Sequence, residues 1–329
     1  MPDCEDDEIS YCDGCDEQVE YCTCDAEEED SGLLGHSARA ERRLSYRGHD
    51  IACQRRRLGF EFECDAATHQ CLDKTMQQTA VAWSKSGLRH ADGYMIAKDD
   101  GSINGDCPVE FVTVPCTVRE HLAVLSAAFP AGRLGGTFLR AWSNGSCGMH
   151  VHVGRTTLTP LQIGKGKIFF NHPANIGFVI NVAGRRPNGY CEAVFDSRCS
   201  DALSDPERFD RYEIYNMANP KTIELRIFRP SPRIPSILKN LEFVESVFEF
   251  VKQAPICSSS LHSVGALSYY HYLRWLSADA HRKTYQWMHG WMMARTGPFG
   301  DAYRVNLRKN VKEDRNGNLK PGLPELGDN

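Results

Sequence analysis

Gly59-Phe60-Glu61-Phe62-Glu63 alternates apolar and acidic residues with a period of two. Successive side chains of an extended strand point to opposite faces, so residues i and i+2 share a face. We therefore predict a β-strand that carries Glu61 and Glu63 on one face and two phenylalanines on the other.

Three further stretches have the same character. Met149-His150-Val151-His152-Val153 places two histidines on one face, and Ile223-Glu224-Leu225-Arg226-Ile227 places an acid beside an arginine. A fourth candidate strand, Val109–Val114, carries Glu110. Polar pairs on otherwise apolar strands could line one cavity against a sheet, and such a cavity would suit metal ions and an anion. Taken singly, each pair is also compatible with a strand whose polar face lies in water.

Helical patterns separate these strands. They cover residues 67–85, 117–129, a segment that starts near Thr159-Pro160, residues 237–253, and aromatic-rich segments up to about residue 296. Thr117 and Glu120 have the spacing of a capping box. The strands and helices do not alternate as regular βαβ units, so we predict an α+β fold with an antiparallel sheet.

Charge is distributed unevenly along the 329 residues. Residues 1–30 contain fourteen Asp and Glu and no Lys or Arg, whereas the remaining 299 carry 38 basic against 29 acidic residues, a net charge of +9. A basic body suits an anionic substrate such as a nucleotide. No secretory signal is readable, and no apolar run approaches the roughly 20 residues of a membrane helix. Nine scattered cysteines then favour reduced thiols and a cytoplasmic location.

The acidic N-terminal segment, residues 1–30, holds a cluster of cysteines. Cys12, Cys15, Cys22 and Cys24 could form a tetrahedral zinc site of four thiolates. The alternative is an acidic tail without a fold of its own. We predict a basic linker over 31–57, a catalytic domain over 58–305 and a loose tail over 306–329.

The polar residues of the strands suggest a type of chemistry. Carboxylates with an imidazole hold hard ions such as Mg²⁺, and an arginine beside them can neutralise a phosphoryl group in transfer. Neither a P-loop nor a GxGxxG fingerprint occurs, so a nucleotide would be held in another way. Cys147 near His150 could form a nucleophile and base. Because no third orienting group is identifiable, a buried structural thiol is the preferred interpretation of Cys147.

Four motifs in order carry a resemblance to a known family. They are Gly59-Phe60-Glu61-Phe62-Glu63, then Asp100-Gly101-Ser102 with Glu110, then Cys147-Gly148-Met149-His150-Val151-His152, and then Thr222-Ile223-Glu224-Leu225-Arg226. Over residues 58–230 the chain resembles the amidoligase family, which is similar to glutamine synthetase and glutamate–cysteine ligase. The resemblance implies an antiparallel sheet that forms a funnel around ATP and divalent metals. It also implies that a substrate carboxylate is phosphorylated there and that an amine captures the acyl phosphate.

The resemblance assigns roles to individual residues. Glu61, Glu63, Glu110 and Glu224 would bind Mg²⁺ or Mn²⁺, and His150 or His152 would complete the set by contacting metal or phosphate. Arg226 would stabilise the transferring phosphoryl group, so Arg226 and Glu61 are the expected catalytic residues. The chain is thus expected to be an ATP-dependent carboxylate–amine ligase that forms an amide or isopeptide bond. Its partners would be an acid and an amine, such as an amino acid, a peptide or a protein.

Two other functions remain open. A zinc-dependent hydrolase could use His150-x-His152, but that fold expects an early HxH strand followed by repeated βα units. A zinc module made by the N-terminal cysteines could bind nucleic acid without catalysis. Nucleic acid is not an expected partner, because the acidic residues around those cysteines would repel phosphate.

Overall fold

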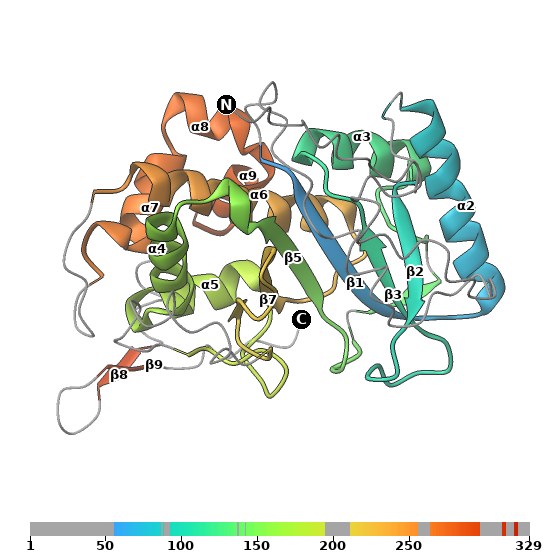
Figure 1. The fold of residues 1–329 in the computed structure, drawn as a ribbon, viewed down its shortest axis with the longest axis horizontal. Coiled ribbons are helices and arrows are strands. Elements are labelled where there is room, and N and C mark those ends of the chain that lie inside the picture. The colour runs from blue at the N-terminus through green and yellow to red at the C-terminus, as the bar shows by residue number, and fades with distance from the viewer. Residues whose placement is uncertain are drawn as a thin grey trace, which may run out of the picture.

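A seven-stranded antiparallel sheet forms the centre of the computed structural model (Figure 1). The structure describes residues 56–86, 88, 93–136, 138–141, 143–194, 211–255 and 264–296, with the backbone of 311–313 and 319–321. Its strands are β1 (Leu58–Ala66), β2 (Met95–Asp99), β3 (Pro108–Thr113), β4 (Leu139–Arg140), β5 (Met149–Gly154), β6 (Tyr215–Asn216) and β7 (Thr222–Phe228). They follow the order β2-β3-β1-β5-β7-β6, and β4 pairs with the end of β1.

Eight α-helices accompany this sheet within the described residues. They are α2 (His69–Lys85), α3 (Val118–Ala128), α4 (Pro160–Asn171), α5 (Pro173–Ala183), α6 (Ile234–Gln253), α7 (Tyr269–Leu276), α8 (Asp279–Thr284) and α9 (Gln286–Thr296). In Figure 1, α2 and α3 lie beside β2 and β3, whereas α4, α5 and α7–α9 lie toward β5 and β7. A separate pair, β8 (Val311–Glu313) and β9 (Leu319–Pro321), forms within the predicted C-terminal tail.

Local sequence explains where several helices begin. The Thr117 hydroxyl accepts from the Glu120 amide while the Glu120 carboxylate accepts from the Thr117 amide, which confirms the predicted capping box. Thr159 and Gln162 form a second one at α4. Helix α2 begins at His69, two residues later than predicted, because Thr68 is extended and its hydroxyl caps the Cys71 amide.

The apolar face of the sheet packs against helices and forms the core. Phe60 and Phe62 of β1 are fully buried on this face, as is Val151 of β5. Helix α3 is tied to β1 through His121, whose Nε2 lies 2.8 Å from the Leu58 carbonyl oxygen. Since that oxygen only accepts, Nε2 carries the proton and Nδ1 accepts from the Tyr94 hydroxyl at 2.8 Å. The helical layer therefore leaves the opposite face of the sheet to the polar residues.

Strand register brings the polar pairs side by side. Glu61 of β1 is opposite His150 of β5, and Glu63 is opposite Glu110 of β3. His152 of β5 is opposite Glu224 of β7. Between Met149 and Val151 the register shifts, so β7 has one more residue than β5 there. Such a bulge re-aims nearby side chains, and here it lies where Arg226 passes His150.

The predicted α+β class and antiparallel sheet are confirmed, whereas the funnel remains a prediction. No helix in the described part of the chain is long and apolar enough to cross a bilayer. Cys12, Cys15, Cys22 and Cys24, like residues 31–55 of the predicted linker, lie outside the described residues. The division of the chain into domains also stays a prediction.

Candidate metal and anion site

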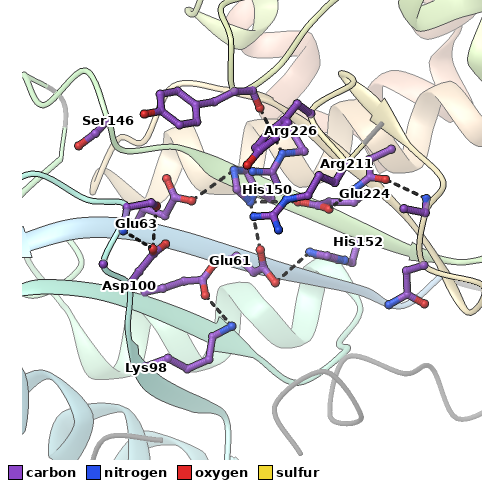
Figure 2. A pocket seen from close by; sticks show the side chains of 18 of the residues that line it. Glu61, Glu63, Lys98, Asp100, Ser146, His150, His152, Arg211, Glu224 and Arg226 are labelled. Carbon is purple, nitrogen blue, oxygen red and sulfur yellow. Dashed lines mark hydrogen bonds and ion pairs between the residues drawn. The ribbon is translucent and has the colours of Figure 1, made fainter. Parts of the chain in front are cut away.

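A cavity of about 900 Å³ opens on the polar face of the sheet (Figure 2). All seven polar residues predicted from the strands line it: Glu61, Glu63, Glu110, His150, His152, Glu224 and Arg226. They come from β1, β3, β5 and β7, four strands that are neighbours in the sheet. The period-two pattern therefore predicted correctly that the polar side chains of each strand point to the same side of the sheet.

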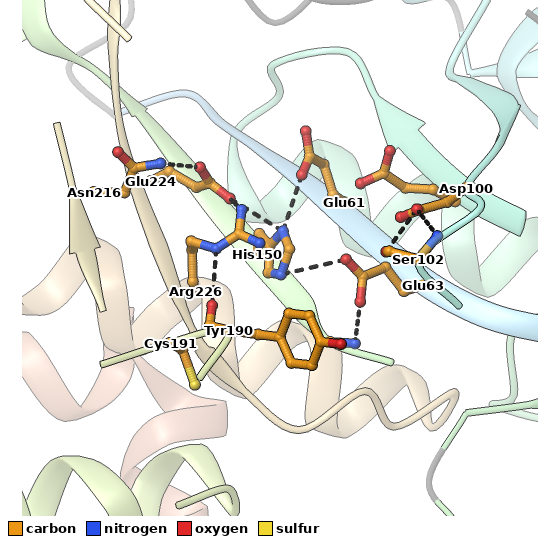
Figure 3. Close-up of polar contacts among 12 residues, drawn as sticks. Glu61, Glu63, Asp100, Ser102, His150, Tyr190, Cys191, Asn216, Glu224 and Arg226 are labelled. Carbon is orange, nitrogen blue, oxygen red and sulfur yellow. Dashed lines mark hydrogen bonds and ion pairs between the residues drawn. The ribbon is translucent and has the colours of Figure 1, made fainter. Parts of the chain in front are cut away.

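His150 lies at the centre of three carboxylates (Figure 3). Its Nδ1 is 3.0 Å from Glu61 Oε2 and 3.1 Å from Glu224 Oε1, and its Nε2 is 3.6 Å from Glu63 Oε1. Burial and the Arg226 charge lower the pKa of His150, but the surrounding carboxylates outweigh them and raise it to about 10. Without a metal ion, the ring is therefore an imidazolium that balances the acids.

His152 lies at the edge of the same cluster. Its Nε2 is 3.3 Å from Glu61 Oε1, yet both of its buried ring nitrogens lack a hydrogen-bond partner among the described residues. Burial raises the pKa of Glu61, but the combined effect of His152 and His150 is larger and lowers it, so that the pKa lies well below its usual value. Buried polar atoms normally have a hydrogen-bond partner, so a bound metal ion or ligand would supply the partner that the ring of His152 lacks.

Glu224 is held from both sides. Arg226 Nη1 donates to its Oε1 at 2.5 Å, and Asn216 Nδ2 donates to its Oε2 at 2.7 Å. Burial raises the pKa of Glu224, but Arg226 and His150 lower it to about 2. Arg226 also donates through Nε to the Tyr190 carbonyl oxygen at 3.3 Å. Glu224 is therefore a fixed, charged carboxylate.

Glu110 is paired with a lysine that the sequence analysis did not single out. Lys98 Nζ of β2 lies 2.6 Å from Glu110 Oε2, and both side chains are only 5% exposed. Burial lowers the pKa of Lys98, but the Glu110 charge more than compensates and raises it. In the protein without metal, this ammonium group supplies a positive charge inside the acidic cluster.

The side chains form three overlapping groups that could each hold a metal ion. The groups are Glu61-His152-Glu224, Glu61-Glu110-His150 and Glu63-Asp100-Glu110, and the ligand atoms within each lie within 4.8 Å of one another. Five carboxylates with two imidazoles form an oxygen-rich donor set that suits Mg²⁺ or Mn²⁺. The ring nitrogens of His152 make no hydrogen bond with a described residue, which is consistent with a role in metal binding. The residues therefore fit the divalent metal that the resemblance implies.

Several lining residues were not assigned to the site from sequence, among them Lys98, Asp100 and Arg185. Asp100 belongs to the quoted Asp-Gly-Ser motif, which was the only available signal, and its Oδ1 accepts from the amide and hydroxyl of Ser102. Lys98 and Arg185 belong to no recognisable motif. They reach the cavity only because distant segments fold together.

Gly148 allows the side chains of Arg185, His150 and Glu63 to approach the backbone closely. Its amide donates to Glu63 Oε2. A Cβ at this position would lie 2.6 Å from Arg185 Nη1, 2.8 Å from His150 Nε2 and 3.1 Å from Glu63 Oε2. These distances are too short for a side chain, so glycine is needed for contact rather than for backbone freedom.

Cys147 does not have the properties of a nucleophile. Its side chain is buried, and burial with the nearby Glu63 and Asp65 charges raises its pKa to about 12. A nucleophilic cysteine needs a lowered pKa. This finding agrees with the preferred interpretation of a structural thiol.

The hydrolase alternative is not supported by the surroundings of its two histidines. His150 is enclosed by three carboxylates, and the sheet is antiparallel rather than a barrel of βα units. The chain matches no protein-family model, and no curated protein is significantly similar to it.

Proposed function

We propose that the protein is an ATP- and Mg²⁺-dependent ligase that joins a carboxylate to an amine through an acyl phosphate. One observation carries this proposal: three overlapping metal-ligand groups and several cationic side chains share one cavity. Shared ligands such as Glu61 and Glu110 would keep neighbouring ions close, as is needed to bridge adjacent phosphates.

The carboxylates Glu61, Glu63, Asp100, Glu110 and Glu224, with His150 or His152, would hold the metal. When bound, Mg²⁺ would neutralise phosphate oxygens and so favour transfer of the phosphoryl group. The chain supplies orientation: Asn216 and Arg226 fix Glu224, and the Gly148 amide fixes Glu63. Partners of this kind tune metal affinity by about 10- to 100-fold.

The proposed reaction follows from the chemistry of carboxylates. A carboxylate oxygen is a poor leaving group, whereas phosphate is a good one, so phosphorylation activates the acid toward an amine. Arginine guanidinium groups in the cavity would stabilise charge that develops on the transferring group. A cavity that excludes water when filled would protect the acyl phosphate from hydrolysis.

Binding of nucleotide is the first test. Mg²⁺-ATP at about 100 times its Kd should stabilise the full-length protein by about 2.7 kcal/mol, a shift of roughly 4 °C in Tm for a protein of this size. Glu63→Gln keeps the side-chain shape but removes a ligand charge, so the shift should largely disappear. Asp73→Asn on the exposed side of α2 removes the same charge away from the cavity and serves as the control.

Turnover is the second part of the same test. The protein should release phosphate from ATP only when a carboxylate and an amine from a pooled set are both present. An equal Tm shift in Glu63→Gln and wild type would place the nucleotide elsewhere. Turnover that requires zinc and no ATP would instead support the hydrolase.

A further inference from the structure

Arg185 lines the cavity although it does not belong to a strand of the sheet. It directly follows Gly184, which ends α5 in the left-handed conformation with φ of 70°. Its Nη1 lies 2.6 Å from the position that a Cβ on Gly148 would take, and His150 Nε2 and Glu63 Oε2 lie within 3.1 Å of the same point. The guanidinium group therefore meets the metal-ligand cluster at its Glu63 end.

The two arginines near His150 differ in their partners. Arg226 donates to Glu224 and to the Tyr190 carbonyl oxygen, so part of its hydrogen-bonding capacity is already used. Arg185 makes no hydrogen bond or ion pair with any described residue. Its planar group is thus available to an incoming ligand that can accept two parallel hydrogen bonds.

Other cations in the cavity are less well placed. Arg211 stacks its guanidinium group 4.9 Å from the centre of the Tyr212 ring, and the Lys221 side chain is exposed. Neither forms an ion pair with a residue in the described ranges, so both are also unneutralised. Arg185 differs from them because it lies against Gly148, beside His150 and Glu63.

We infer that Arg185 binds an oxyanion, namely the phosphate chain of the nucleotide substrate. Arg226 is instead a positioning residue that acts through Glu224. The inference rests on the proposed function and refines the role that sequence assigned to Arg226. Phosphate oxygens are the expected ligand because metal held by Glu63 would draw them to this end of the cavity. A substrate carboxylate also presents two acceptor oxygens to a guanidinium group and is the alternative source of the oxyanion.

The experiment separates the two arginines by binding rather than by turnover. First, Mn²⁺ binding to the full-length protein is followed by electron paramagnetic resonance of the free ion. Arg226→Ala should lower the Mn²⁺ affinity by about 10-fold or more, on the scale of lost ligand-orienting partners. Arg185→Ala should not lower it, because Arg185 contacts no ligand oxygen through a hydrogen bond.

Second, calorimetry measures binding of inorganic tripolyphosphate to the Mn²⁺-loaded protein, with succinate as the carboxylate probe. Arg185→Ala should weaken tripolyphosphate binding by about 10- to 100-fold, the effect of one lost charged hydrogen-bonding group. Arg185→Lys should recover only part of this loss, because it keeps the charge but not the fork. Lys74→Ala, on the exposed side of α2 and outside the cavity lining, is the control for a general loss of positive charge and should change Kd by less than about 3-fold.

Each outcome has a distinct meaning. Equal tripolyphosphate affinity in Arg185→Ala and wild type, or an equal loss in Lys74→Ala, would overturn the inference and leave the proposed function standing. Loss of succinate binding alone in Arg185→Ala would also overturn it, by assigning Arg185 to the acid substrate. Wild-type protein that binds neither Mn²⁺ nor tripolyphosphate would overturn the proposed function as well.

Discussion

Three glutamates on one face of the sheet have pKa values shifted in different directions: the pKa of Glu63 is raised, whereas those of Glu61 and Glu224 are lowered. Burial raises the pKa of Glu63, and this effect prevails over the nearby histidine. In Glu61 and Glu224, burial has the same direction, but His152, His150 and Arg226 reverse it. Glu61 and Glu224 are therefore ionised before a metal arrives, whereas Glu63 gives up its proton less readily. Metal binding to the Glu63 end of the cluster should consequently be coupled to proton release.

Gly148 offers a sharp test of the site geometry. Gly148→Ala would force its Cβ against Arg185, His150 and Glu63, and overpacking of this kind costs about 1–3 kcal/mol. We expect Mn²⁺ affinity to fall by roughly 5- to 100-fold if that free energy is taken from the site. Gly145→Ala is the matched control, because its Cβ would meet no atom within 4 Å. Similar Mn²⁺ affinities in the two variants would show that the groups above Gly148 are not required for binding.

At this scale the sequence predicted residues whose position depends on strand period alone. Glu61 and Glu63 share a face in any extended strand, so no long-range information was needed. Lys98 and Arg185 could not be found in this way. Lys98 enters the cavity because β2 pairs with β3 and brings it opposite Glu110, and Arg185 enters because its long side chain reaches from the end of α5 to Gly148.

At the scale of elements, it was easier to predict whether a segment is a helix or a strand than to predict where it begins and how the strands pair. The helix over 237–253 is present but begins at Ile234, because Pro235 fits the first turn of α6 instead of preceding the helix. The two-residue strands β4 and β6 have too few residues to show a period. The register that pairs Glu61 with His150, and the bulge near Arg226, depend on strands far apart in the chain.

His121 should make the attachment of α3 to β1 sensitive to acid. Burial lowers its pKa from 6.5 to about 4, so the unfolded chain takes up this proton first as pH falls. The stabilisation is therefore complete above about pH 6.5 and is lost toward pH 4, by up to about 3 kcal/mol. Denaturant titrations between these pH values should show a smaller loss in His121→Gln than in wild type.

Subtracting the variant from the wild type removes contributions from other titrating groups in this comparison. Tyr94→Phe is a useful companion, because it removes only the hydroxyl that donates to Nδ1. Parallel curves of unfolding free energy against pH for wild type and His121→Gln would contradict a neutral, buried histidine at this position.

In the whole molecule, one face of the sheet forms the core and the other face carries the cavity. Helix α3 contacts both α2 and α6, α2 contacts β1 and β2, and α6 contacts β5, so apolar side chains of the strands are buried there. The cavity lies on the other face and is bordered by Arg185 and by several residues of 211–221 rather than covered by a helix layer. The same antiparallel strands thus supply both core and site, which explains why one alternating pattern predicted both.

The last prediction concerns how the acidic N-terminal segment relates to this body. The core and the cavity lining that the structure describes lie within 56–296, so deletion of residues 1–30 should preserve Mn²⁺ binding and the cooperative unfolding of the sheet. If Cys12, Cys15, Cys22 and Cys24 form a structural site, full-length protein should carry about one zinc per chain, and the deletion should remove it. Mass spectrometry of the native protein and thiol titration measure both quantities. Metal-free full-length protein whose four N-terminal thiols react freely would exclude the zinc site. Loss of Mn²⁺ binding on deletion would show that the acidic segment contributes to the cavity.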